Sequence, residues 1–388
     1  MAVRVRALIG TLPASQLPAV VVTNVGPAYI GQQGVLLEQF GASADGRVNF
    51  DFSTTANASN VISLSSTFTS ADIGKWLVVY YSLQCTNYLL GQITNIVNAT
   101  TVNLNSNAQL TVSGQMGRWG TDNTIPVNQA VAWCLSNNVH NIYATNGTYV
   151  FASQPILTGS NNLQPIYSII QVGTANYWHN YGTYTNGPFQ LSIIGQGDSK
   201  EATTGYYTQQ RKGVTGGTIF YCPIVGSHNG NDYLISMSSS NSCFGYINTK
   251  IRGLNFLHPA WTTMSTIDNA FGGAIKISQC EFTSDWNGQV NQAPNQGQGW
   301  GNTNCLQIRL ANTSNNGDQI VEDSEFDGGW SAAIGSDHAD FYRDWIIRQA
   351  IGYLSLRGLE QYFDDTRFDV CMTNMWLGVD CSTERGRL

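Results

Sequence analysis

The sequence predicts an all-β protein, most of it a parallel β-helix that is capped by one N-terminal helix, with a small inserted β domain. The first observation is a degenerate six-residue pattern that recurs in the last third of the chain. Its copies are I-R-G-L-N-F (251–256), I-S-Q-C-E-F (277–282), V-E-D-S-E-F (321–326), Y-R-D-W-I-I (342–347) and F-D-D-T-R-F (363–368). Self-similarity at a period of about 20 to 50 residues is the signature of a solenoid or propeller.

The second observation is the shape of each repeating unit. Every copy alternates apolar with polar residues and is bounded by Gly, Asn, Asp or Ser, which is the periodicity of strands. The fourth position falls on Leu254, Cys280, Ser324, Trp345 and Thr366, so the steps are 26, 44, 21 and 21 residues, and the 44 is interpreted as two coils of 22. A second set of apolar strands lies between the copies. Two or three short strands in 21 to 26 residues describe one β-helix coil, because a propeller blade needs about 40 residues.

Composition agrees with this interpretation. Charged residues are 11% of the 388 residues, against about 25% in ordinary soluble domains. The net charge of −7 disfavours nucleic acid as a partner, since phosphates require a basic surface. The eight cysteines show neither a zinc pattern nor a disulfide framework, so buried free thiols are expected.

Residues 1–34 are predicted to form a mostly irregular arm that attaches the protein to a partner. Arg4 and Arg6 precede apolar residues, as in a signal peptide. Pro13 and Pro18 interrupt that apolar run, which argues against a cleaved signal and against a membrane span.

Residues 35–118 are predicted to hold the first cap strand and a small inserted β module. The segment 35–46 looks like a strand that ends in a Gly-rich turn. Short β-like runs at 61–64, 75–81, 91–97 and 101–104 then follow with turn signals between them. Regularly spaced short strands of this kind indicate a barrel or sandwich of about 70 residues.

The β-helix is assigned to residues 119–388 and begins with a capping helix at about 124–137. Pro126 lies in the first helical turn, and Val127, Ala130, Val131 and Cys134 follow helical spacing. An amphipathic helix at this point covers the open end of a β-helix, whose first coil would otherwise expose apolar surface.

Three motifs carry a resemblance to a known family. The series F-G-A-x-x-D-G (40–46), G-T-D-N-T (120–124) and I-Y-A-T-N-G-T-Y (142–149) resembles the start of pectate-lyase-like domains in bacteriophage tailspikes. F-T-S-A-D-I-G-K-W-L-V-V (68–79) is similar to a small β module common in such phage proteins. The resemblance implies a right-handed parallel β-helix of the pectin-lyase type. It also implies a homotrimer on the virion surface, held to other virion proteins by the arm, that binds host surface polysaccharide.

The repeat alignment also nominates catalytic residues. With positions four and six inward, position three places Asp323, Asp344 and Asp365 outward on consecutive coils about 4.8 Å apart, and Glu325 lies beside them at position five. Like charges in a recessed column raise carboxyl pKa values, which a general acid requires. Adjacent coils suit a retaining glycosidase, and carboxylates two coils apart approach the separation of an inverting one. Ca²⁺ bridged by two carboxylates, with Arg or Lys as the base of a lyase, is the alternative, and no other cofactor or metal is expected.

Aromatic and basic side chains nominate a glycan surface. Trp286, Trp300 and Trp330 lie in Gly/Asn/Gln-rich segments, and Arg343 and Arg367 flank the acidic column. Exposed aromatic faces stack on sugar rings, although the same residues also suit a subunit interface. The expected function is a tailspike-like surface appendage that binds host polysaccharide, with cleavage by a glycosidase or lyase mechanism as an open question. The alternative is a non-catalytic structural virion protein such as a head decoration, fibre or tail component, favoured by the absence of a C-terminal stem before Leu388.

Overall fold

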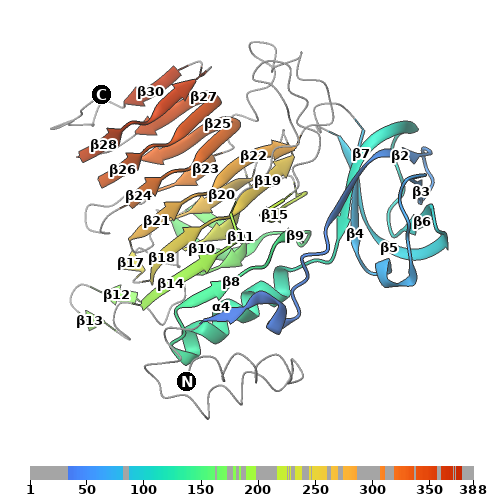
Figure 1. Cartoon of the computed structure of the whole chain (residues 1–388), viewed down its shortest axis with the longest axis horizontal. Helices are drawn as coiled ribbons and strands as arrows, with labels where there is room; N and C mark the ends of the chain where they lie inside the picture. Colours follow the sequence, from blue (N-terminus) through green and yellow to red (C-terminus); the bar gives the residue numbers. More distant parts are fainter. Residues whose placement is uncertain are drawn as a thin grey trace.

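Most strands of the protein belong to two large sheets that run the length of a stack of coils (Figure 1). The computed structural model describes residues 34–81, 87–161, 164–172, 178–180, 183–184, 189–197, 216–224, 226, 228, 232–237, 244–245, 247–259, 264–269, 274–285, 306–310, 319–335, 338–355, 360–369, 371 and 373–377. Within these residues the protein is all-β apart from one α-helix and two short 3-10 turns, η1 (Leu37–Phe40) and η2 (Ser70–Asp72).

The first large sheet is parallel and receives one strand from each coil. Its order is β1 (Val35–Leu36), β8 (Asn141–Tyr143), β14 (Phe189–Ile194), β18 (Ile247–Arg252), β21 (Ile275–Ser278), β24 (Gln319–Glu322), β26 (His338–Tyr342) and β28 (Glu360–Asp364). Neighbours in this order come from successive coils, so the chain returns to the same sheet once per turn.

The second large sheet holds the remaining strands of the coils and is parallel except at β10. Its strands are β9 (Gly147–Val150), β10 (Ile156–Asn161), β11 (Gln164–Gln171), β15 (Thr218–Tyr221), β16 (Asp232–Ser236), β19 (Asn255–Pro259), β20 (Ser265–Asp268), β22 (Glu281–Asp285), β23 (Leu306–Arg309), β25 (Glu325–Gly335), β27 (Trp345–Ser355), β29 (Arg367–Asp369) and β30 (Thr373–Leu377). A small third sheet contains β12 (Trp178–Asn180), β13 (Thr183–Tyr184) and β17 (Phe244–Gly245). The topology fits a parallel β-helix.

The interval of 44 residues is one coil, not the two that its length suggested. β21 pairs directly with β24, and β22 pairs directly with β25, with Ile277 opposite Val321 and Glu281 opposite Glu325. Strands that are hydrogen-bonded neighbours leave no space for another coil between them. The extra residues therefore belong to the connections of a single turn.

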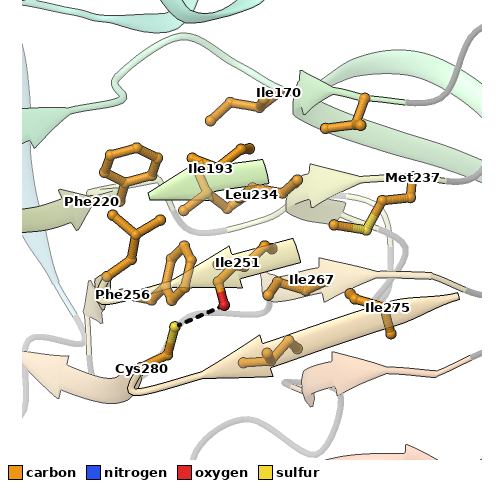
Figure 2. Packing of buried hydrophobic residues seen from close by; sticks show 14 of the residues in the cluster. Ile170, Ile193, Phe220, Leu234, Met237, Ile251, Phe256, Ile267, Ile275 and Cys280 are labelled. Carbon is orange, nitrogen blue, oxygen red and sulfur yellow. Dashed lines mark hydrogen bonds between the residues drawn. The ribbon is translucent and has the colours of Figure 1, made fainter. Parts of the chain in front are cut away.

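Identical columns of apolar side chains fill the interior. In the second sheet, Phe220, Phe256, Phe282 and Phe326 occupy one register position on successive coils and are fully buried. Figure 2 shows how such columns from facing strands meet, with Phe220 and Phe256 beside Ile193 and Ile251 of the first sheet. Because strand side chains alternate, every inward position repeats at the same point of each coil.

The thiols follow the same logic. Cys134, Cys222 and Cys280 are buried free thiols, and burial raises the pKa of each to about 12. Thiols with such pKa values are protonated and behave as small apolar side chains.

The capping helix α4 (Thr124–Asn137) lies across the first coil, where the sequence predicts a helix. Val127, Val131 and Leu135 are buried in the same cluster as the coil interior, whereas Ile125 is exposed. No helix in the described part of the chain is long and apolar enough to cross a membrane.

The inserted module is a closed six-stranded barrel beside the first coils (Figure 1). Its strands, in closed order, are β2 (Arg47–Thr54), β3 (Asn60–Ile62), β6 (Thr101–Leu104), β5 (Tyr88–Asn98), β4 (Trp76–Tyr80) and β7 (Val112–Gly120). A buried cluster joins the two parts, with Tyr80 and Met116 of the barrel packing against Ile219, Tyr221 and Leu257 of the coils. The hydroxyl groups of Tyr80 and Tyr221 are hydrogen-bonded to each other.

Residues of the motifs at 40–46 and 120–124 form hydrogen bonds at the junction between the barrel, the helix and the first coil. The Asn123 side chain is fully buried; its Oδ1 accepts the Ser43 N–H at 2.7 Å, and its Nδ2 donates to the carbonyls of Ser43, Thr121 and Val150 at 3.1, 2.8 and 3.3 Å. Asp45 accepts the Thr121 N–H at 2.9 Å and pairs with the Lys75 ammonium at 2.8 Å. The polar residues of these motifs therefore have structural roles here.

Replacing Asn123 with alanine should lower the free energy of unfolding by roughly 2–4 kcal/mol, because buried backbone groups would lose their partners. Denaturant unfolding of the variant measures this loss. Ser136→Ala on the exposed face of α4 is the matched control, expected within about 0.5 kcal/mol of the parent. Equal stability of Asn123→Ala and the parent would show that this network is dispensable.

Candidate functional site

Each of the five coils that contain β18, β21, β24, β26 and β28 turns from the first sheet into the second through one residue with positive φ. The φ values lie between 50° and 64°, in the left-handed region that residues other than glycine adopt rarely. The residues at this position on successive coils are Gly253, Gln279, Asp323, Arg343 and Asp365. The turn reverses which side chain faces inward, so it fixes the register of the whole corner.

The predicted column Asp323–Asp344–Asp365 is wrong by one residue at its middle member. Glu325 pairs with Trp345, and Trp345 with Arg367, so Asp323 and Asp365 stand in line with Arg343. The sequence alignment of segment 342–347 was shifted by one position, because it matched Asp344 with the Asp of the neighbouring copies, whereas the structure has Arg343 at that position. Asp344 instead follows the turn and lies inside the coil, 1% exposed.

A groove of about 960 Å³ runs along this corner over five coils. Its lining residues are Ile194, Gly195, Gln196, Gly197, Arg252, Gly253, Asn255, Gln279, Cys280, Glu281, Asp323, Ser324, Glu325, Arg343 and Trp345. The groove thus brings together Asp323, Glu325 and Arg343 of the predicted site residues. It does not include Asp344, Asp365 or Arg367.

Asp323 and Arg343 form an ion pair at the rim of the groove. The guanidinium Nε donates to Oδ1 at 2.6 Å and Nη2 donates to Oδ2 at 2.9 Å. The hydrogen bond from Arg343 holds the pKa of Asp323 below its usual value. Asp323 is therefore an ionised, occupied carboxylate near neutral pH, which does not suit a general acid. One coil earlier, the Arg252 Nε donates to the Gln279 amide oxygen at 2.9 Å.

Asp344 belongs to a polar ladder inside the corner. The Cys280 N–H donates to Ser324 Oγ at 3.2 Å, and the Ser324 N–H donates to Asp344 Oδ1 at 2.8 Å. Ser324 and Asp344, which follow two successive turns, thereby each bind an N–H of the preceding coil. The other oxygen of Asp344, Oδ2, is buried with no hydrogen-bond partner in the described part of the chain. Burial raises the pKa of Asp344 to about 7.

The floor of the groove is a second column, one residue beyond Asp344 and its equivalents. Asn255, Glu281, Glu325 and Trp345 stand in register on successive coils, and Arg367 continues the column beyond the groove. Glu281 and Glu325 are neighbours here, on coils about 4.8 Å apart. The Arg367 guanidinium carbon lies 5.6 Å from the Trp345 ring centroid, and Arg367 also pairs with Asp369 at 2.9 Å.

The three tryptophans predicted to bind glycan have no described side chain. Trp286 and Trp300 lie outside the described residues, and only the backbone of Trp330, within β25, is described. The sequence alignment missed Trp345, which it placed inside the coil. Aligning Phe341 with Ile251, Ile277, Val321 and Phe363 would have placed Trp345 on the outside.

Among the described residues, no group of three or more His, Cys, Asp or Glu side chains is arranged to hold a metal ion.

Comparison with known proteins gives little for this chain. No family model and no curated protein matches it. Among solved structures, it is similar to the A-module of the mannuronan C-5 epimerase AlgE4 of Azotobacter vinelandii. The identity is 8% over 68% of this chain and 96% of that module, with a TM-score of 0.16.

Proposed function

We propose that this chain is a tailspike-like protein of a phage virion surface and that its corner groove binds a host surface polysaccharide. The tailspike motifs of residues 40–46, 120–124 and 142–149 support this assignment. The proposal includes a right-handed, pectate-lyase-like winding of the coils, a homotrimeric assembly and attachment to other virion proteins through residues 1–34.

The groove is the observation that carries the proposal. An extended polymer needs a binding surface that repeats along its own length, and the groove offers one set of side chains per coil, about 4.8 Å apart. Amide groups of Gln196 and Gln279 match sugar hydroxyls as donors and acceptors. Trp345 adds an aromatic ring to the same surface.

The geometry of the groove supports polysaccharide binding better than it supports cleavage by the carboxyl groups predicted from sequence. Asp323 is engaged by Arg343, and Asp344 lies inside the coil, so these two carboxyls form no open acid–base pair. A cleaving form of the protein would rely on Glu325 with its neighbour Glu281, the carboxylate side chains of the groove floor. The same observation favours the second candidate, a non-catalytic structural component of the virion. The position of the protein in an intact particle separates the two, because a place in the capsid lattice is incompatible with a tailspike.

Trp345→Ala is expected to weaken polysaccharide binding about tenfold or more, since an aromatic contact buried by the ligand is worth about 1–2 kcal/mol. The measurement is equilibrium binding to a panel of purified capsular and O-antigen polysaccharides, with chain length determined after incubation. Lys250→Ala, on an exposed face of β18 outside the groove, is the control and should bind like the parent. Equal binding by Trp345→Ala and the parent would show that the groove is not the polysaccharide-binding site.

A further inference from the structure

A second concave site lies where the barrel meets the first coil. It has a volume of about 460 Å³ and is lined by Gly46, Arg47, Val48, Asn49, Ser65, Ser66, Thr67, Arg118, Trp119 and Thr148. Volumes of about 300 to 1,000 Å³ are typical of small-molecule sites. This junction pocket is separate from the corner groove, because the two share no lining residue.

The wall of the junction pocket is held in place before any ligand arrives. Ser65, in the loop after β3, donates its N–H to Asp51 Oδ2 at 2.7 Å, and the Asp51 Oδ1 accepts the Ser63 hydroxyl. Asn49 Nδ2 donates to the Ser66 hydroxyl at 3.0 Å. Trp119, which pairs with Arg47 across β7 and β2, packs in the barrel core against Phe52 and Phe68. A site whose side chains are already fixed loses little entropy when a ligand binds.

The groups left open in this pocket are hydrogen-bond donors. The side chain of Arg47 is exposed and makes no hydrogen bond or ion pair within the described part of the chain, and the same holds for the Thr67 hydroxyl. An arginine side chain presents five N–H donors and cannot accept a hydrogen bond.

A second positive charge stands behind this wall. The Arg118 side chain is buried, and its guanidinium carbon lies 5.2 Å from the centre of the Tyr221 ring. Asp51 of β2, the carboxylate bonded to this wall, already accepts hydrogen bonds from Ser63 and Ser65. The pocket therefore offers the unpaired guanidinium of Arg47 on a protein whose net charge is −7.

We propose that the junction pocket binds the carboxylate of an acidic saccharide, with Arg47 as the anchoring residue. A carboxylate supplies acceptors only and matches the arginine fork with two parallel N–H···O bonds. The volume accommodates one or two sugar rings, so the site recognises a terminal or single acidic sugar and not an extended chain. The donors of the pocket argue for a carboxylate, and the choice of a saccharide rests on the proposed function. Glucuronate binding that is lost in Arg47→Ala would support this site even if the corner groove binds no polysaccharide.

Isothermal titration of the full-length protein with sodium glucuronate and, separately, with neutral methyl glucoside tests the proposal. Glucuronate is expected to bind at least about tenfold more tightly than methyl glucoside, a difference of about one charge-assisted hydrogen bond. Arg47→Ala should weaken glucuronate binding about tenfold or more, and Arg47→Lys should restore only part of it, because lysine cannot form the bidentate pair. Lys250→Ala should bind glucuronate like the parent.

Because Arg47 is exposed, its variants should fold, and circular dichroism checks this. Thr67→Val provides an independent second variant, with a smaller expected loss of glucuronate affinity. Three results would overturn the proposal: no heat of binding with glucuronate, equal affinity for the neutral sugar, or an unchanged affinity in Arg47→Ala.

Discussion

Phe282→Ala is expected to lower the free energy of unfolding by about 3–5 kcal/mol, the usual loss for a large-to-small change in a packed core. Phe282 is fully buried between two other phenylalanines of the same column. Its ring centroid lies 5.0 Å from that of Phe256 and 4.6 Å from that of Phe326, and the rings of Phe282 and Phe326 are nearly parallel, at 3°. Removing the middle ring leaves a cavity between two coils and ends both aromatic contacts.

Denaturant unfolding followed by tryptophan fluorescence measures this effect. Phe50→Ala is the matched control, because Phe50 lies on barrel strand β2 and is 38% exposed. The control should change stability by less than about 0.5–1 kcal/mol. A loss below about 1 kcal/mol in Phe282→Ala would contradict a continuous core column and, with it, the coil register described above.

Asp344→Asn is expected to alter the difference in unfolding free energy between pH 4 and pH 8 by on the order of 4 kcal/mol. The folded-state pKa of Asp344 is about 7, raised by burial from an ordinary value of 3.8. A group whose pKa is raised by folding stabilises the protein fully below its unfolded-state pKa and loses that contribution as the pH rises through its folded-state pKa. Three pKa units at about 1.4 kcal/mol each give the stated size.

His258 is a second buried group, and its effect on the pH dependence of stability is opposite to that of Asp344 over the same pH range. His258 is buried, and burial lowers its pKa from 6.5 to about 4. Because the unfolded chain takes up this proton first, His258 destabilises the protein as the pH falls from about 6.5 to 4. The parent protein should therefore show a rather flat profile, while Asp344→Asn should become clearly more stable as the pH rises.

The difference between parent and variant is the quantity to measure, by chemical denaturation at pH 4, 6 and 8. Asp323→Asn is the control, since it removes an exposed ion pair worth at most about 1 kcal/mol. Parallel profiles for the parent and Asp344→Asn would show that Asp344 is ionised in the folded state. Asp344→Asn should also leave polysaccharide binding within about twofold of the parent, because its side chain lies beneath the groove.

Strand identity and general architecture could be predicted from the sequence because they depend on local patterns. Period-two alternation marks the strands around Phe256, Phe282 and Phe326, and helical spacing with Pro126 in the first turn marks α4. Both signals come from side chains that repeat at a fixed spacing, so tertiary contacts reinforce them.

The site depended on features that local patterns do not determine. The sequence alignment of 342–347 was off by one residue, so it predicted Asp344 on the surface and Trp345 in the interior. A register shift of one residue exchanges the two faces of a strand. The long connections of the coil between Gln279 and Asp323 imitated an extra repeat. The groove itself arises from positive φ at Gln279, Asp323 and Arg343, conformations that no residue type in this set requires.

The position of a bound oligosaccharide tests the central claim most directly. The measurement is the crystal or cryo-electron microscopy structure of the protein in complex with a fragment of the polysaccharide that it binds in the panel. We predict sugar density along the corner groove, crossing Gln279, Glu325 and Trp345 on successive coils. Density on another face, with the corner groove empty, would contradict the account.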